Sequence, residues 1–181
     1  MRRPVPTQRE RTFQADEIIV SKTDSRGWMT YVNDVFCRVS LYSEAELLGQ
    51  PHSLIRHPDM PRAVFHLLWQ RIQEGKEIFA YVKNLARNGD YYWVLAHVTP
   101  SFDGQGRIDG YHSNRRCPAR EAIATVEPLY HKIRAEEERH DDRKAGLQAG
   151  IAVLEDALAG LGLDYDRFVL GLAASHMETA A

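Results

Sequence analysis

Short runs of hydrophobic residues early in the chain predict an opening β-hairpin. Residues 18–20 are apolar and β-branched, residues 28–32 mix aromatic, β-branched and polar side chains, and the turn-forming run 24–27 lies between them. Asn33 then stands where its side chain can cap a short helix, and residues 43–46 form a capping box before another helical turn. The first third of the chain is therefore expected to hold two strands followed by short helices.

A proline-rich segment separates these helices from a longer one. Residues 50–61 hold three prolines, so they cannot form one continuous helix. Pro61 suits the first turn of a helix that ends near Gly75. Apolar residues in that helix recur every three or four positions, which predicts that one of its faces covers a sheet.

Three further strands are expected over residues 77–85, 91–99 and 107–113. Glycine-containing turns join them, as an antiparallel meander requires. Two strands, several helices and three more strands give an α+β fold, in which a five-stranded antiparallel sheet carries short helices on one face. We place this domain at residues 16–116.

The two ends of the chain have a different character. Residues 1–15 are rich in Arg and Pro and predict a flexible arm that docks on the domain or on a partner. Residues 117–181 predict a helical tail with two apolar stripes, the first interrupted by Pro128, and between them a charged run, 134–144, that reads as a solvated helix or linker. Because we expect that both stripes cannot be buried without a partner surface, the tail is assigned to dimerisation or output.

Composition narrows the class of protein. The chain has 181 residues, and 23 Lys and Arg against 25 Asp and Glu give a net charge of -2, which does not favour a nucleic-acid partner. No apolar stretch approaches the roughly 18 residues of a membrane span, and the N-terminus has no secretory signal, so we expect a cytoplasmic protein that does not insert into membranes. The two cysteines, Cys37 and Cys117, form no CxxC pair, and no metal site is predicted.

The candidate chemistry gathers in the proline-rich segment. Arg56, His57 and Asp59 lie in a run that prolines stiffen, directly before the helix that carries Trp69. A guanidinium group binds phosphate or a polar ring edge, and an indole ring offers a large face for stacking. These four residues are candidates for binding an anionic, planar ligand; the alternative is a polar loop whose charges pair with one another and cap the next helix.

Two asparagines extend the candidate site. Asn84 lies inside a predicted strand, where asparagine is disfavoured, so a ligand-binding role gains weight there. Asn33 is a candidate for the same role, with helix capping as the alternative. Arg115, on the last predicted strand, could sense charge on a ligand, but such a residue more often faces solvent, and we leave it out of the predicted site.

Six motifs spread over residues 31–111 resemble those of one known family, the flavin-binding PAS domains of the bacterial aerotaxis-receptor type. They are Tyr31-Val32-Asn33-Asp34-Val35-Phe36, Gly49-Gln50-Pro51-His52, Ile55-Arg56-His57-Pro58-Asp59-Met60-Pro61, Val82-Lys83-Asn84, the run from Arg87 to Trp93, and Gly110-Tyr111. The resemblance covers about residues 18–116 and continues over Val126–Tyr130. It implies a PAS fold with FAD between the helices and the sheet, and cytoplasmic sensing of redox, oxygen or energy state.

The resemblance also shapes the expected site and partners. It implies that Arg56, His57, Asp59, Trp69 and Asn84 bind the cofactor. FMN is possible in place of FAD, a haem held by one histidine is a weaker alternative, and a ligand-free PAS adaptor is the other reading. The receptor's membrane segment and signalling coiled coil have no counterpart here, so we expect a stand-alone sensor that forms a homodimer through its tail and acts on a downstream signalling protein. No nucleophile–base pairing is seen, so we expect no enzyme activity.

Overall fold

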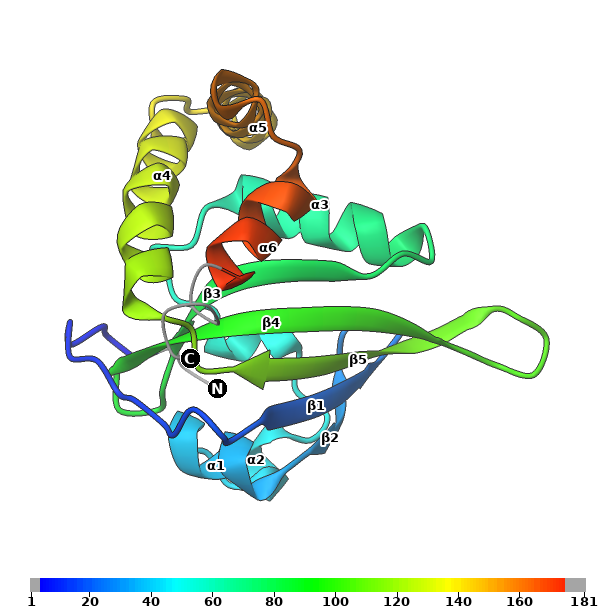
Figure 1. Ribbon diagram of the computed structural model, residues 1–181. Helices are drawn as coiled ribbons and strands as arrows, with labels where there is room; N and C mark the ends of the chain where they lie inside the picture. Colours follow the sequence, from blue (N-terminus) through cyan, green and yellow to red (C-terminus); the bar gives the residue numbers. More distant parts are fainter. Residues whose placement is uncertain (1–3, 175–181) are drawn as a thin grey trace.

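A five-stranded antiparallel sheet forms the centre of the computed structural model, which describes residues 4–174. The strands are ordered β2-β1-β5-β4-β3 (Figure 1). Their bounds are β1 Ile19–Asp24, β2 Met29–Val32, β3 Ile78–Leu85, β4 Tyr91–Phe102 and β5 Ile108–Arg116. The predicted α+β fold, with its opening hairpin and its later meander, is confirmed.

Three short helical elements and one longer helix connect β2 to β3. They are α1 Asp34–Ser40, α2 Glu44–Leu47, the 3₁₀ helix η1 His52–Ile55 and α3 Arg62–Gln73. The predicted capping box is present, because Ser43 and Glu46 bond each other's backbone N–H groups at the start of α2. The proline-rich segment interrupts the helices as expected, with Pro51 before η1 and Pro61 before α3.

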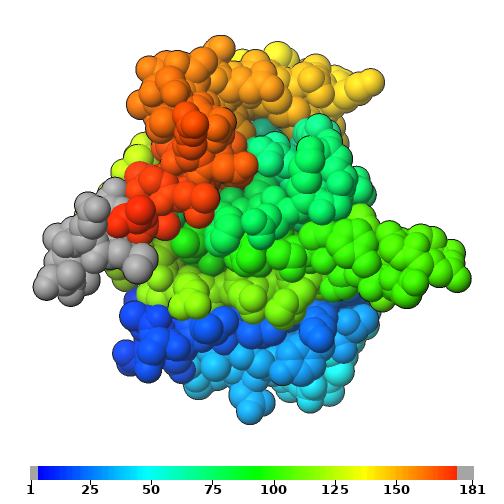
Figure 2. All heavy atoms as spheres, turned by 45° about the vertical axis from the view of Figure 1, so that its right-hand side comes forward, coloured from blue at the N-terminus to red at the C-terminus, as the bar shows by residue number. Residues whose placement is uncertain are grey.

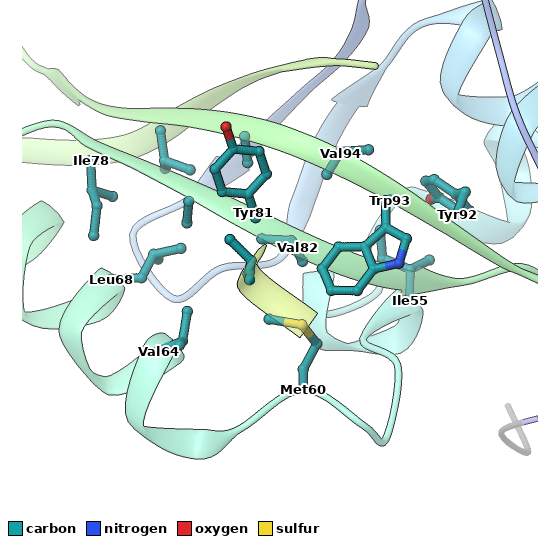
Figure 3. Packing of buried hydrophobic residues seen from close by; sticks show 14 of the residues in the cluster. Ile55, Met60, Val64, Leu68, Ile78, Tyr81, Val82, Tyr92, Trp93 and Val94 are labelled. Carbon is teal, nitrogen blue, oxygen red and sulfur yellow. The ribbon is translucent and has the colours of Figure 1, made fainter. Parts of the chain in front are cut away.

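The predicted apolar face of α3 packs on the sheet. Val64 and Leu68 are buried and point toward β3, where Val82 also lies (Figure 3). Ile72 continues the same face one turn later and is 2% exposed.

The N-terminal arm is docked on the domain over its described residues. The backbone N–H of Thr7 donates to the carbonyl of Gly89 (2.8 Å), and Arg9 and Arg11 exchange backbone hydrogen bonds with Tyr91 (2.9 and 2.7 Å). Phe13 is buried against the core. The arm predicted to be flexible therefore adds a short paired segment next to the turn between β3 and β4, and Met1 to Arg3 lie outside the described residues.

The tail folds back onto its own domain. It consists of α4 Arg120–Glu138, α5 Arg143–Leu161 and α6 Tyr165–Ala174, and α4 continues through Pro128 without a break. Helix α5 crosses above α3, and α6 lies against β3 (Figures 1 and 2). The last predicted tail residues, 175–181, lie outside the described part of the chain.

The burial of the tail corrects two expectations. The first stripe, Val126 and Ile133 included, is buried within one chain, so it needs no partner surface. The second stripe is only partly covered: Leu154 and Leu158 are buried, whereas Leu161 is 60% exposed. The two helices and α3 cover one another, which a stripe read alone does not reveal. Nor is the charged run wholly solvated, because Glu137 is only 3% exposed.

Over residues 4–174, no single helix has both the length and the apolar character that crossing a membrane requires. The pair α5 and α6, bent by 62° at their junction, reaches that length and composition only when the two are taken together.

Candidate functional site

A cavity of about 360 Å³ lies between α3 and the sheet. Its volume falls in the range of about 300–1,000 Å³ that is typical of small-molecule sites. Most of its walls are apolar. The aliphatic wall side chains from the strands are Val82, Val94, Ala96 and Val98, and the apolar ones from α3 are Phe65, Leu68, Trp69 and Ile72.

Three of the six predicted site residues line this cavity: Arg56, Trp69 and Asn84. The guanidinium carbon of Arg56 lies 3.3 Å from the centre of the Phe65 ring, so this cation is held flat against the wall. Asn84 is 3% exposed, and its Nδ2 atom has no hydrogen-bond partner among the described residues. A buried amide donor without a partner costs free energy, so Asn84 is where a polar ligand atom would be gained.

Trp69 forms part of the cavity wall. Its ring packs edge-on against Tyr111, with 5.5 Å between the ring centres. Gly27, in the turn before β2, has φ +82°, and a Cβ added there would lie 2.9 Å from the Trp69 ring. Glycine is therefore required at this position for two reasons: the backbone is left-handed there, and the indole ring occupies the space that a Cβ would need.

A cluster of polar groups around Arg115 also lines the cavity, and none of its members was among the predicted site residues. Arg115 of β5 is 2% exposed, and its Nε donates to the hydroxyl of Ser113 (3.1 Å). Its Nη2 contacts the Ser21 hydroxyl and lies 2.7 Å from Nε2 of His52. Burial, with the charges of Arg115 and Arg56 added, holds the pKa of His52 well below its usual range, so this ring is neutral and accepts the hydrogen bond.

A signal for this cluster was present in the sequence. Tyr111, Ser113 and Arg115 alternate along one strand, so all three face the side of the sheet on which Asn84 lies. The expectation that Arg115 faces solvent was wrong, because Ser21 and His52 come from distant segments to satisfy its donors.

His57 and Asp59 do not line the cavity. The His57 ring is fully buried against Tyr91, on the other side of β3, and its Nδ1 accepts the backbone N–H of Asp59 (3.1 Å). Burial lowers the pKa of His57 to about 4, so the ring is neutral. The Asp59 carboxylate accepts hydrogen bonds from Lys83 (3.0 Å) and Arg134 (2.8 Å). The structure therefore places both residues outside the cavity lining, where they tie the loop to β3 and α4.

The alternation of side chains along an extended segment explains why Arg56 faces the cavity while its neighbour His57 does not. The segment around Arg56 runs antiparallel beside β3, with Arg56 opposite Asn84, and the N–H of His57 donates to the carbonyl of Lys83 (3.3 Å). Successive side chains of an extended segment point to opposite sides. Arg56 and Asn84 therefore face the cavity, whereas His57 and Lys83 face away from it.

Asn33 is a helix cap and lies outside the cavity lining. Its Oδ1 accepts the N–H groups of Phe36 and Val20 (both 3.0 Å), and its Nδ2 donates to the carbonyl of Ile18 (2.8 Å). Because the side-chain oxygen and nitrogen are both used locally, the structure favours the alternative that the sequence left open, capping of α1.

Lys83 joins the back of the cavity wall to the tail. It is 4% exposed, and its Nζ lies 3.0 Å from Asp59 and 3.2 Å from Glu127 of α4. Lys83 is adjacent in β3 to Asn84, which faces the cavity. A shift of β3 at Asn84 would therefore act directly on the ion pairs that hold α4.

One family model and several curated proteins are similar to this chain. The profile of one family, described as PAS fold, matches residues 29–114. The chain is 42% identical to the aerotaxis receptor of Escherichia coli (strain K12) over 132 residues, which are 73% of this chain and 26% of that protein. It is 33% identical to the nitrogen fixation regulatory protein of Klebsiella pneumoniae over 99 residues, which are 55% of this chain and 20% of that one. The chain thus spans only about a quarter or less of the length of these curated relatives.

A solved structure supports the fold assignment. A Light-Oxygen-Voltage domain, solved in a study of its mechanism with a flavin analogue, superimposes with a TM-score of 0.54. The superposition covers 64% of this chain and 86% of that one, at 14% sequence identity. At this identity the likeness concerns the fold.

Proposed function

We propose that the domain formed by residues 29–114, which has the PAS fold, binds FAD in the cavity beneath α3 and reports the redox state of the flavin to a signalling partner. The observation that carries this proposal is the combination of apolar walls with the unpartnered Nδ2 of buried Asn84. A flavin ring is planar and apolar across its middle, with a polar edge of carbonyl oxygens and ring nitrogens. Such a ring fits between the strand and α3 walls with its polar edge toward Asn84 and Arg115.

The residues present fit a flavin better than a haem. His52 is the histidine that lines the cavity, and its Nε2 already accepts a hydrogen bond from Arg115. A haem ligand would need that nitrogen for the iron. The relatives point the same way, since one is named an aerotaxis receptor and a structural neighbour was studied with a flavin analogue.

FAD is proposed over FMN, as the resemblance to the aerotaxis-receptor family implies. Arg26 also lines the cavity, with 78% of its side chain exposed, next to the Gly27 turn. A cation at the cavity edge suits a diphosphate that extends from a buried ring into solvent.

Signal transmission is proposed to run through β3. A bound flavin supplies a centre whose charge and protonation change with its redox state. The Asn84 amide would gain or lose a hydrogen bond with that change, and Lys83 beside it would transmit the displacement to Asp59 and Glu127. A differential contact of about 1–3 kcal/mol between two states suffices to bias the position of α4.

The remaining parts of the proposal concern the setting in which the sensor works. We place the chain in the cytoplasm, as a sensor without enzyme activity that acts on a downstream signalling protein. A homodimer through the tail is kept as a proposal. Its support is the set of exposed leucines at the end of α5, in the connection that follows and on α6: Leu161, Leu163 and Leu170.

Titration of the flavin-free full chain with FAD and with FMN, followed by flavin fluorescence, tests the proposal. We expect FAD to bind more tightly than FMN, and Asn84→Ala to weaken FAD binding about tenfold, the effect of one hydrogen bond of about 1.4 kcal/mol. Asn114→Ala is the matched control, because Asn114 lies on β5 between Ser113 and Arg115 and points to the opposite face.

Two results would count against it. A chain that takes up neither flavin would leave a ligand-free PAS adaptor as the function. Equal affinities of the wild-type chain and Asn84→Ala would show that the ring edge lies elsewhere.

A further inference from the structure

Arg115 is a buried cation without a counter-charge in the described structure. Its hydrogen-bond partners Ser113, Ser21 and His52 are all neutral, and its Nη1 atom has no partner among residues 4–174. The guanidinium carbon lies 4.9 Å from the centre of the Phe36 ring, which stabilises the charge only weakly. Although burial lowers the pKa of Arg115 to about 10, the group remains charged at neutral pH.

Lys83, which is also buried, has the counter-charges that Arg115 lacks within the described part of the chain. Lys83, 4% exposed, has two carboxylates within 3.2 Å, whereas no carboxylate lies within ion-pair distance of Arg115 in the described residues. Isolated buried charges are costly, and they are normally paired. Because Arg115 lines the cavity, a ligand can supply the anion that the protein does not.

The charged and titratable groups around Arg115 are His52, Tyr92 and Arg56. His52 of η1 is held neutral, and Tyr92 of β4 is buried with its pKa raised mainly by burial, so it is neutral too. Arg56 is a second cation of the same cavity, stacked on Phe65. The local field around Arg115 is therefore positive and is not cancelled by any of these neighbours.

A flavin ring meets such a field differently in its two redox states. The oxidised ring is neutral. Uptake of two electrons and one proton, with the proton bound at N5, leaves one negative charge over N1 and the neighbouring carbonyl oxygen. A second proton at N1 would make the reduced ring neutral again, but a cation next to that edge opposes this protonation.

Building on the proposed function, we propose that Arg115 binds the N1 edge of the flavin and holds the reduced ring in its anionic form. Arg115 thereby raises the reduction potential, because it stabilises the product of reduction more than the oxidised ring. The redox signal then reaches the protein as the appearance of a full negative charge opposite Arg115.

The test is a redox titration of the flavin-loaded full chain across the neutral pH range, with dithionite as the electron donor and a reference dye. One proton per two electrons predicts a tenfold change in the reduction equilibrium per pH unit, about 30 mV. A change of about 60 mV per pH unit in the wild-type chain, which means two protons per two electrons, would overturn the proposal.

Three variants sharpen this test. Arg115→Gln is expected to shift the equilibrium at least tenfold toward the oxidised ring, about 30 mV, and to increase the pH dependence to about 60 mV per unit. Arg115→Lys keeps the charge and is expected to keep the pH dependence of the wild type. Arg116→Gln removes the same charge one residue away, on the exposed opposite face of β5, and is expected to change neither quantity.

The outcomes separate this proposal from the one on which it rests. Flavin binding with the same potential and pH dependence in the wild type and Arg115→Gln overturns the role of Arg115 and leaves the flavin sensor standing. A chain that binds no flavin overturns both. Should Arg115→Gln fail to fold, the pH dependence of the wild type and of Arg115→Lys still decides the matter.

Discussion

Replacing Glu137 of α4 with glutamine should destabilise the folded chain by about 1–4 kcal/mol. The Glu137 carboxylate is 3% exposed and accepts the backbone N–H groups of Arg62 and Ala63 (2.9 and 2.8 Å), the first two residues of α3. It also accepts Nε–H of Arg62 (3.1 Å). A tail residue thus provides the N-terminal cap that Pro61, which has no side-chain acceptor, cannot give.

The magnitude follows from what glutamine retains. Its amide keeps one acceptor oxygen but places an NH₂ group against the second N–H of α3, so one buried donor is left unsatisfied at about 1–3 kcal/mol. The favourable interaction of the negative charge with the helix N-terminus, about 0.3–1 kcal/mol, is lost as well. Relaxation is limited, since Gly150 of α5 packs so closely on Glu137 that an added Cβ would lie 2.6 Å from its side chain.

Urea unfolding followed by far-UV circular dichroism measures this effect. Glu138→Gln is the matched control, because its side chain is 60% exposed and pairs with Arg134 on the same helix. We expect the control to stay within about 0.5 kcal/mol of the wild type. Equal unfolding midpoints for Glu137→Gln and Glu138→Gln would refute the reasoning that a buried tail carboxylate caps α3.

Three other substitutions test the loop, the cavity and the link to the tail. The pKa of His57 is about 4 in the folded chain, against an ordinary value of 6.5. Between these two pH values the unfolded chain binds more protons than the folded chain, so the stability of the fold decreases as the pH is lowered. Over this pH range the urea midpoint of His57→Gln should therefore fall less than that of the wild type. Gly27→Ala should cost about 1–2 kcal/mol through its positive φ and its contact with Trp69, and a variant as stable as the wild type in urea would contradict that strain. Lys83→Met removes the ion pair between Lys83 and Asp59 and should lower the free energy of unfolding by about 3 kcal/mol, with faster proteolysis between α4 and α5. An unchanged cleavage rate would contradict the role of Lys83 in holding the tail.

Local patterns predicted the elements of this fold well. The hairpin, the capped helices, the amphipathic α3 and the glycine-joined meander each depend on residues close in sequence, where turn chemistry and periodicity act directly. The burial of the tail was misjudged, because α4, α5 and α3 cover one another's apolar faces and no single stripe contains that information.

Only three of the six predicted site residues line the cavity, and the reason is geometric. Arg56 and His57 are adjacent in sequence, yet only the pairing of their segment with β3 decides that Arg56 faces the cavity. Arg115 was left out because its partners Ser21 and His52 come from segments more than 60 residues away. Side chains brought together by distant segments need the fold before they can be recognised.

The most direct test of the flavin sensor is the absorption spectrum of the purified full chain, with the mass of any chromophore released by heat. We predict the two-banded near-ultraviolet and blue absorption of an oxidised flavin and the mass of FAD. A colourless chain that also fails to take up added FAD would contradict the account.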